Sequence, residues 1–243
     1  MKIIIAKDYD EGSRISADIM SEMVANKPDC VLGLATGSTP IGMYEYMAKD
    51  YKEKGVSYAN VKTVNLDEYV GLDANHDQSY AYFMNYNLFS KIDIDKANTN
   101  LPSGVALDSK AECDRYNKLL ATLVPDIQVL GLGTNGHIGF NEPGTPFNSV
   151  TQLVNLTEST IKDNSRLFAN VDEVPKQAFS MGISNIMSAK KILMMAFGKN
   201  KAKAVKGMIE GEVTPALPAS VLQMHADVTV VLDPDSASLL ENK

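Results

Sequence analysis

The sequence predicts an α/β fold of three layers, with a mainly parallel sheet flanked by helices on both faces. Short apolar runs alternate with amphipathic segments along the whole chain, which is typical of consecutive βα units. Seven of these runs are apolar almost throughout, as expected for parallel strands that helices cover on both faces. No repeat, low-complexity tract or linker interrupts the pattern. We therefore expect a Rossmann-like arrangement in a single domain that spans residues 1–243.

Each strand is expected where an apolar run of four to six residues is bounded by turn formers or charges. In chain order the runs are Lys2–Ala6, Cys30–Ala35, Val61–Leu66, Ile127–Leu132, Ala178–Met181, Ile192–Phe197 and Val228–Leu232.

Helices are expected between these strands. In the first, Ile15, Ile19 and Met23 recur at helical spacing after Ser13, and Pro28 follows its end. Amphipathic spacing predicts further helices over Ile41–Lys54, Gln78–Phe89, Ser109–Leu123, Asn200–Glu210 and Ser220–His225.

One polar segment, residues 157–174, breaks the alternation between apolar strands and amphipathic helices. It carries Lys162, Asp163, Arg166 and Asp172. It is interpreted either as a lid over a binding site or as a solvated surface helix with a loop, and the sequence alone leaves both open.

The composition excludes several classes of partner. A net charge of -7 argues against nucleic acid or an anionic membrane surface as the main partner, because both require basic protein surfaces. The opening run Ile3–Ala6 is too short for the core of a signal peptide, and no segment has the apolar length of a membrane span. Cys30 and Cys113 form no metal-spaced or redox pair, so we expect a reduced, cytoplasmic protein.

Sheets of this kind bind ligands beyond the carboxyl ends of their strands, so the residues that follow each strand are the candidates for function. The first such segment is Thr36-Gly37-Ser38-Thr39-Pro40. Its hydroxyl groups and backbone N–H groups, placed before a helix, suit a phosphate, although an ordinary helix cap has the same composition. Arg166 and Lys201 are candidate cations for that phosphate.

The second segment contains two adjacent acids, Asp67 and Glu68, after the Val61–Leu66 strand. In an extended backbone they point to opposite sides, so only one of them can face a given pocket. A carboxylate in such a pocket can serve as a general base near neutral pH, whereas a solvated acidic turn is the structural alternative.

The third segment is the glycine-rich loop Gly131–Gly144. Gly131, Gly133 and Gly136 fit a dinucleotide-binding fingerprint, but that site needs a helix to follow, and the prolines and turn formers of 137–146 exclude one. The loop instead presents His137, a natural proton shuttle near neutral pH, with Glu142 close enough along the chain to orient it. The alternative is a histidine that caps a turn or fills the core.

A metal site is not expected, because His76, His137 and His225 lack the short ligand spacing of zinc sites.

These three segments together resemble the glucosamine/galactosamine-6-phosphate isomerase family, within the wider superfamily that includes the 6-phosphogluconolactonases. The similarity extends over nearly the whole chain and is carried by LATGSTP at 34–40, NLDEYVGL at 65–72, GLGTNGHIGFNEPG at 131–144, NSR at 164–166, NKA at 200–202 and LQMH at 222–225. It implies a glucosamine-6-phosphate deaminase, which converts glucosamine 6-phosphate and water to fructose 6-phosphate and ammonia without a cofactor.

The resemblance also implies roles for individual residues. Asp67 would move the proton from C2 to C1 through an enolamine, and His137, supported by Asn135 and Glu142, would open the sugar ring. The remaining expected substrate-binding residues are Thr36, Gly37, Ser38, Thr39, Glu68, Gly136, Arg166 and Lys201, of which Gly37, Ser38, Thr39, Arg166 and Lys201 would hold the phosphate.

The sequence departs from the family at Asn135, where many members carry aspartate. An amide cannot neutralise a protonated His137, which leaves Glu142 as the anionic partner within the motif. The chain also stops soon after Leu232, so we expect the longer C-terminal region of the allosteric hexamers to be missing and the protein to be a monomer, with a homo-oligomer as the alternative.

Two other functions remain open at this stage. A 6-phosphogluconolactonase would share the fold and the glycine loop but would not require the base at Asp67. A non-enzymatic sensor of sugar phosphates would require neither His137 nor Glu142.

Overall fold

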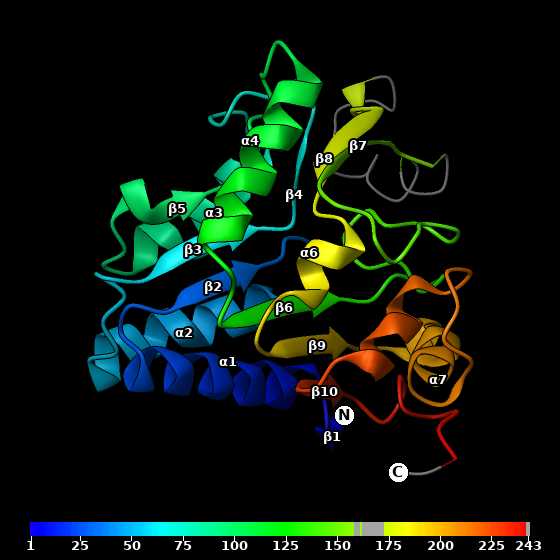
Figure 1. The fold of residues 1–243 in the computed structure, drawn as a ribbon. Helices are drawn as coiled ribbons and strands as arrows, with labels where there is room; N and C mark the ends of the chain where they lie inside the picture. The colour runs from blue at the N-terminus through cyan, green and yellow to red at the C-terminus, as the bar shows by residue number, and fades with distance from the viewer. Residues whose placement is uncertain (158–160, 162–172, 242–243) are drawn as a thin grey trace.

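A parallel sheet forms the centre of the computed structural model, which describes residues 1–157, 161 and 173–241 (Figure 1). Within these residues the sheet has seven strands in the order β1-β10-β9-β6-β2-β3-β5, and every neighbouring pair is parallel. The strands are β1 (Lys2–Ile5), β2 (Val31–Leu34), β3 (Lys62–Asn65), β5 (Thr99–Asn100), β6 (Ile127–Gly131), β9 (Ile192–Ala196) and β10 (Val228–Leu232). The expected parallel sheet is confirmed, with the short β5 as an addition.

Helices cover the sheet on both sides. They are α1 (Tyr9–Asn26), α2 (Ile41–Lys54), α3 (Tyr80–Asn87), α4 (Ser109–Thr122), α6 (Ile183–Met187) and α7 (Ala202–Glu210), with short 3₁₀ helices η1 (Phe89–Lys91), η2 (Lys96–Asn98), η4 (Lys199–Lys201) and η5 (Pro218–Met224). The helices α1 and α2 pack together on one side, and α4 and α6 lie on the other (Figure 1). The three-layer prediction is therefore confirmed, although Ser220–His225 falls in a 3₁₀ helix and α6 had no predicted counterpart.

A second, antiparallel sheet stands beside the first and corrects one prediction. It consists of β4 (Asp67–Tyr69), β8 (Gln177–Ser180) and β7 (Gln152–Asn155) in the order β4-β8-β7. The Ala178–Met181 run, expected as a parallel strand, belongs to β8 and pairs antiparallel with both neighbours. The apolar residues of this run are buried, Ala178 in a small separate core with Tyr69 and Phe140 and Met181 in the main core. Burial of this kind looks the same in sequence as burial in the main sheet.

The chain leaves β2 and β6 in opposite directions across the sheet, which opens a crevice at their carboxyl ends. These strands pair only at Leu32 with Ile127 and at Gly33 with Gln128. Beyond that point the buried Tyr44 hydroxyl donates to the Ala35 carbonyl at 2.6 Å and accepts from the Ala35 N–H at 3.2 Å. Because Tyr44 satisfies these backbone groups, β2 needs no pairing partner there, and space remains for a ligand at the topological switch point.

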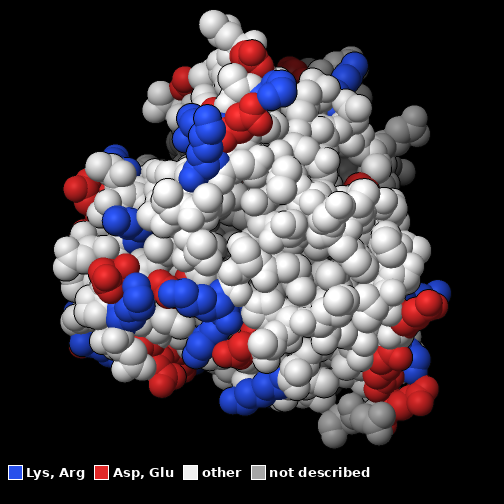
Figure 2. All heavy atoms as spheres, in the orientation of Figure 1, with Lys and Arg blue, Asp and Glu red and all other residues white. Residues whose placement is uncertain are grey.

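The surface shows charges of both signs. On the face seen in Figure 2, Lys and Arg side chains stand among Asp and Glu side chains. None of the helices in the described part of the chain combines the length and the apolar character that a membrane crossing requires.

Candidate functional site

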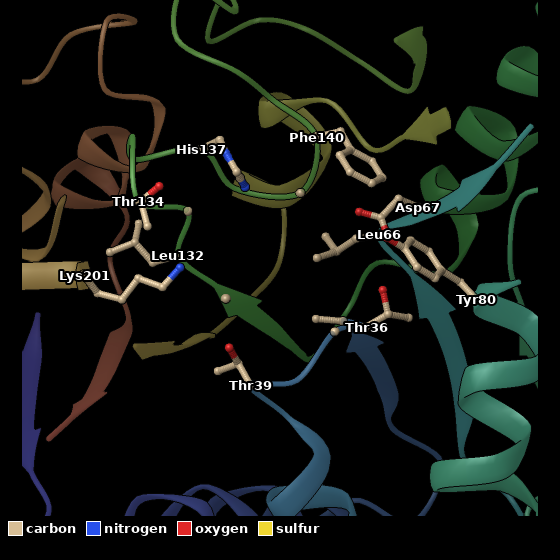
Figure 3. A pocket seen from close by; sticks show the side chains of 15 residues that line it. Thr36, Thr39, Leu66, Asp67, Tyr80, Leu132, Thr134, His137, Phe140 and Lys201 are labelled. Atoms are coloured by element: carbon tan, nitrogen blue, oxygen red, sulfur yellow. The ribbon is translucent and has the colours of Figure 1, made fainter. Parts of the chain in front are cut away.

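A cavity of about 250 Å³ occupies the crevice and collects side chains from all three predicted segments (Figure 3). Asp67 and His137 both point into it, and Lys201 reaches in from the side opposite Asp67 (Figure 3). The lining residues are Ala35, Thr36, Gly37, Thr39, Leu66, Asp67, Tyr80, Gly131, Leu132, Gly133, Thr134, His137, Gly139, Phe140 and Lys201. The cavity therefore has an acidic end and a cationic end.

The turn after β2 forms one wall of the cavity. Gly37 has a φ of +86°, a left-handed conformation that glycine adopts readily. The Tyr9 hydroxyl, at the start of α1, accepts the Gly42 N–H at 2.9 Å and lies 3.2 Å from the carbonyl oxygens of both Ser38 and Thr39. This link between α1 and α2 fixes the turn, with Thr39 in the cavity lining and Ser38 outside it.

Lys201, one of the two predicted cations, lines the cavity. It ends η4 directly before α7, and the turn that leads to it begins at Gly198, which has a φ of +90°. The Gly198 N–H donates to both carboxylate oxygens of Asp233, at 3.0 and 2.9 Å, so the turn is held to the segment after β10. The other predicted cation, Arg166, and most of the predicted lid at 157–174 lie outside the described residues.

Asp67 begins β4 and is only 6% exposed. Burial, together with the negative charge of the neighbouring Glu68, raises the pKa of its carboxyl to about 8. A carboxyl group with this pKa is ionised in roughly one tenth of molecules at pH 7 and in half at pH 8. Asp67 therefore has the proton affinity of a general base that works near neutral pH.

Glu68, expected to bind substrate, does not line the cavity. Its carboxylate turns to the other side of β4, where it accepts the N–H groups of Tyr80 and Ala81, each at 2.9 Å. The extended backbone of β4 causes this alternation, as anticipated for two consecutive acids of which one can face a pocket. Asp67 is the one that does.

The glycine loop after β6 continues without a helix, as the sequence predicted. A Cβ on Gly133 would lie 2.4 Å from two atoms of the His137 ring, so a side chain there would displace the imidazole. The Gly133 N–H also donates to the His137 carbonyl at 2.9 Å. The glycines therefore make room for the imidazole at the cavity wall.

Asn135 and Glu142 lie behind His137 rather than in the cavity lining. The Asn135 amide donates to Glu142 Oε2 at 2.7 Å, and its Oδ1 accepts the backbone N–H of His137 at 3.2 Å. Glu142 Oε1 is 3.7 Å from His137 Nδ1, which is close enough for charge stabilisation but too long for a hydrogen bond. Asn135 therefore connects the carboxylate to the histidine backbone, and the electrostatic support of the ring comes from Glu142.

Gly136, another expected substrate-binding residue, also lies outside the lining. Its φ is +85°, and a Cβ there would lie 2.6 Å from the Leu217 side chain. Its carbonyl accepts the Ala219 N–H at 2.9 Å. Gly136 thus packs the loop against the segment before η5.

Three residues at the Asp67 end of the cavity escaped prediction from the sequence. Tyr80 and Phe140 line it, with ring planes within 10° of parallel and centroids 6.3 Å apart. The buried Ser180 lies opposite Asp67 in the β4–β8 pair, and its Oγ accepts the Phe140 N–H at 3.1 Å. No local pattern marks Ser180, because the pairing of β4 with β8 brings it to the glycine loop across 40 residues of sequence.

The chain is similar to known proteins over nearly its whole length. Residues 10–231 match the family described as glucosamine-6-phosphate isomerases/6-phosphogluconolactonase. The chain is 48% identical over 242 residues to a protein of Clostridium perfringens (strain 13 / Type A), covering 99% of this chain and 100% of that protein. It is 49% identical over 244 residues to a protein of Clostridium botulinum (strain Kyoto / Type A2), covering both chains completely. Both relatives are named glucosamine-6-phosphate deaminase.

Solved structures agree with the sequence comparison. A monomeric glucosamine-6-phosphate deaminase superimposes with a TM-score of 0.97 at 46% identity, over 99% of this chain and 100% of that one. A 6-phosphogluconolactonase from Trypanosoma brucei superimposes with a TM-score of 0.79 at 20% identity, over 98% of each chain, which shows a shared fold. The chain therefore belongs to the glucosamine-6-phosphate isomerase/6-phosphogluconolactonase family.

Proposed function

We propose that this protein is a glucosamine-6-phosphate deaminase that converts glucosamine 6-phosphate and water to fructose 6-phosphate and ammonia. The observation that carries the proposal is the presence of a buried base, Asp67, and an imidazole, His137, in one cavity with Lys201 at its far side. The near-full-length relatives at 48–49% identity are named for this activity, and the lactonase at 20% identity shares the fold only.

The chemistry starts with ring opening. His137 in its protonated form gives a proton to the ring oxygen and takes up the proton of the C1 hydroxyl, which breaks the C1–O5 bond and leaves an open-chain aldehyde. The Glu142 carboxylate, 3.7 Å from Nδ1, stabilises the protonated imidazole. Asn135 holds that carboxylate in place.

Isomerisation and deamination follow on the open chain. Asp67 removes the C2 proton while the aldehyde oxygen gains a proton from solvent, which forms an enolamine. Asp67 then gives its proton to C1, which leaves a protonated imine at C2 that releases a proton when it is hydrolysed. Water adds to this imine and ammonia departs, giving the ketone of fructose 6-phosphate. No cofactor enters this sequence, and the two proton-transfer centres lie on different strand ends, so their proton affinities can differ.

The phosphate contacts are proposed to come from Gly37, Ser38, Thr39, Arg166 and Lys201. Thr39 and Lys201 line the cavity. Energy gained by binding the phosphate, which is remote from the reacting carbons, can hold the open chain against Asp67.

The test of this function is direct. Incubation with glucosamine 6-phosphate should release ammonia and fructose 6-phosphate in equal amounts, and in deuterated water the sugar should gain deuterium at C1. Hydrolysis of 6-phosphogluconolactone without ammonia release from glucosamine 6-phosphate would refute the proposal and favour the lactonase. Binding of the amino sugar phosphate without turnover would favour the sensor.

We also propose that the protein acts as a cytoplasmic monomer in amino-sugar catabolism. The structural relative at 46% identity is described as monomeric. Sedimentation at micromolar concentration should give one species near the chain mass of 26.4 kDa. A dimer or hexamer would contradict this.

Replacement of Lys201 by methionine should weaken substrate binding and slow turnover. Loss of a charged phosphate partner in a partly buried site costs about 2 kcal/mol or more, so KM should rise about 30-fold. Turnover should also fall, because the phosphate positions the open chain. Steady-state kinetics measure both effects. Lys203, exposed on α7 and outside the cavity lining, provides the matched control, and Lys203→Met should change neither.

Replacement of Asn135 by aspartate should extend activity to higher pH. The new carboxylate would replace the amide that now donates to Glu142 Oε2 at 2.7 Å. It would add negative charge beside Glu142, and this charge would stabilise the protonated imidazole of His137. The alkaline limb of the rate profile should therefore move up by about half a pH unit or more. Asn135→Ala, which breaks the link without adding charge, should lower the rate without that shift. An unchanged alkaline limb in Asn135→Asp would contradict the coupling.

A further inference from the structure

Glu68 has an unusual position for a carboxylate, because it is only 2% exposed and has backbone N–H groups as partners. Its Oε1 accepts from Tyr69 at 2.8 Å and from Tyr80 at 2.9 Å, and its Oε2 accepts from Ala81 at 2.9 Å. These N–H groups stabilise the ionised form and offset part of the cost of burial, which raises the pKa of Glu68 to about 6. Glu68 is therefore a buried anion at neutral pH.

Two of the three donors belong to the first turn of α3. N–H groups in the first turn of a helix have no partner within the helix. Ser79 Oγ accepts the Tyr82 N–H at 3.0 Å, and Glu68, from a strand 12 and 13 residues earlier, accepts those of Tyr80 and Ala81. The carboxylate thus fastens the start of α3 to β4.

The fastened residue Tyr80 forms part of the cavity wall next to Asp67 (Figure 3). Its ring lies 4.6 Å from that of Tyr69 and 6.3 Å from that of Phe140, measured between centroids. If Glu68 released α3, this aromatic wall would loosen and water would reach Asp67.

The charge of Glu68 acts on the same base. The other titratable groups that surround Asp67 or share its cavity are Tyr44 on α2, Tyr80 on α3, Tyr116 on α4, His137 in the glycine loop and Lys201. Burial keeps the pKa of each of these tyrosines well above its usual value, so their hydroxyls are neutral near pH 8. Among the described residues, Glu68 is the one whose charge raises the pKa of Asp67.

We propose that Glu68 is a positioning residue that acts through Asp67: its buried carboxylate holds the start of α3, and with it Tyr80, against β4, and places a second negative charge beside the base. This inference rests on the proposed deaminase function for its kinetic readout. It assigns Glu68 no contact with substrate.

The experiment compares Glu68→Gln with the unmutated protein in the pH dependence of kcat/KM for glucosamine 6-phosphate. Glutamine keeps the size of the side chain but removes the charge, so Asp67 ionises more easily and the acid limb should move to lower pH. The rate at pH 7, where Glu68 of the unmutated protein is mostly ionised, should rise about twofold or more relative to the rate at pH 9, which corresponds to a shift of half a pH unit. The maximal rate should fall, because the amide nitrogen cannot accept the N–H that the second carboxylate oxygen now accepts.

Two controls separate charge from structure. Glu68→Asp keeps the charge, so its acid limb should stay within about 0.2 pH unit of the unmutated protein even if its maximal rate falls. Ser79→Ala removes another side-chain acceptor from the first turn of α3 but leaves Glu68 charged. It should therefore leave the acid limb of kcat/KM where it is. A uniform loss of rate in Glu68→Gln with an unmoved limb would overturn the proposal.

A second measurement on the unmutated protein covers the case in which Glu68→Gln does not fold. Carbon-13 NMR of side-chain carboxyl groups should show Asp67 titrating near 8 and Glu68 near 6. Titration of Asp67 below about 5 would overturn the inference, since that is the range of an unperturbed carboxyl group. This NMR titration needs no turnover. If the protein had no deaminase activity, the proposed function would be refuted, and the titration would still test the inference about Glu68.

Discussion

Replacement of Asp67 by asparagine is expected to lower the formation of fructose 6-phosphate by ~10²–10⁴-fold, the usual range for loss of a general base. Asparagine has nearly the same shape, so the cavity keeps its form, but an amide cannot take the C2 proton. The carboxyl group of the buried Asp67 has a pKa of about 8, so at neutral pH most molecules carry it in the uncharged, protonated form. The cavity should therefore accommodate an uncharged amide at this position. The measurement is a coupled assay of fructose 6-phosphate, together with ammonia release.

Binding provides the control for this variant. Titration calorimetry with glucosamine 6-phosphate should give a Kd within about threefold of the value for the unmutated protein at pH 6, where Asp67 carries little charge. In deuterated water the variant should incorporate no deuterium at C1 of the sugar. If Asp67→Asn kept more than a tenth of the rate, the base would have to be another residue.

The same pKa predicts how the unmutated protein responds to pH. Since the base must be ionised, and the pKa of Asp67 is raised to about 8, kcat/KM should rise with pH from 6, reach about half of its maximum near pH 8 and approach that maximum near pH 9. An acid limb of kcat/KM with its midpoint near pH 4 would show that the Asp67 carboxyl group is exposed to water.

Replacement of His137 by glutamine is expected to produce the second large loss, about 10²-fold, in the same assay. The loss should be smaller than for Asp67, because sugar rings also open spontaneously at a slow rate and the variant retains its base. Glutamine has polar atoms that can hydrogen-bond, but its amide cannot exchange a proton near pH 7.

The two variants should differ in a way that identifies the step each residue performs. Exchange NMR of glucosamine 6-phosphate measures the interconversion of its two anomers, which requires ring opening but no removal of the C2 proton. Asp67→Asn should still accelerate this exchange, and His137→Gln should not. Loss of exchange in both variants, or in neither, would contradict the division of roles between the imidazole and the carboxylate.

Local patterns in the sequence were sufficient for the segments that carry the chemistry. The glycine loop excluded a following helix through its prolines, and the structure has none there. The alternation of a strand predicted that Asp67 and Glu68 diverge, and only Asp67 enters the cavity. These features depend on backbone preferences of neighbouring residues, which the sequence states directly.

Features that depend on residues distant in the chain were missed or misassigned. Ala178–Met181 was expected in the parallel sheet, because an apolar run does not reveal its partner strand. Glu68 was expected to bind substrate, and nothing in the sequence shows that its carboxylate meets the N–H groups of residues 80 and 81. Likewise, no pattern links Ser180 to the Phe140 N–H.

The sequence by itself determined the α/β architecture and the three strand-end segments that meet at one cavity. Only the tertiary structure decided that Asp67, His137 and Lys201 face one cavity and that Glu68, Asn135 and Gly136 stand outside it. The physical reason is that periodicity records which side of an element is buried, whereas strand pairing and packing across the switch point determine what each buried group meets. The raised pKa of Asp67 depends on this packing, because it arises from burial and from the neighbouring carboxylate of Glu68, which the first turn of α3 binds.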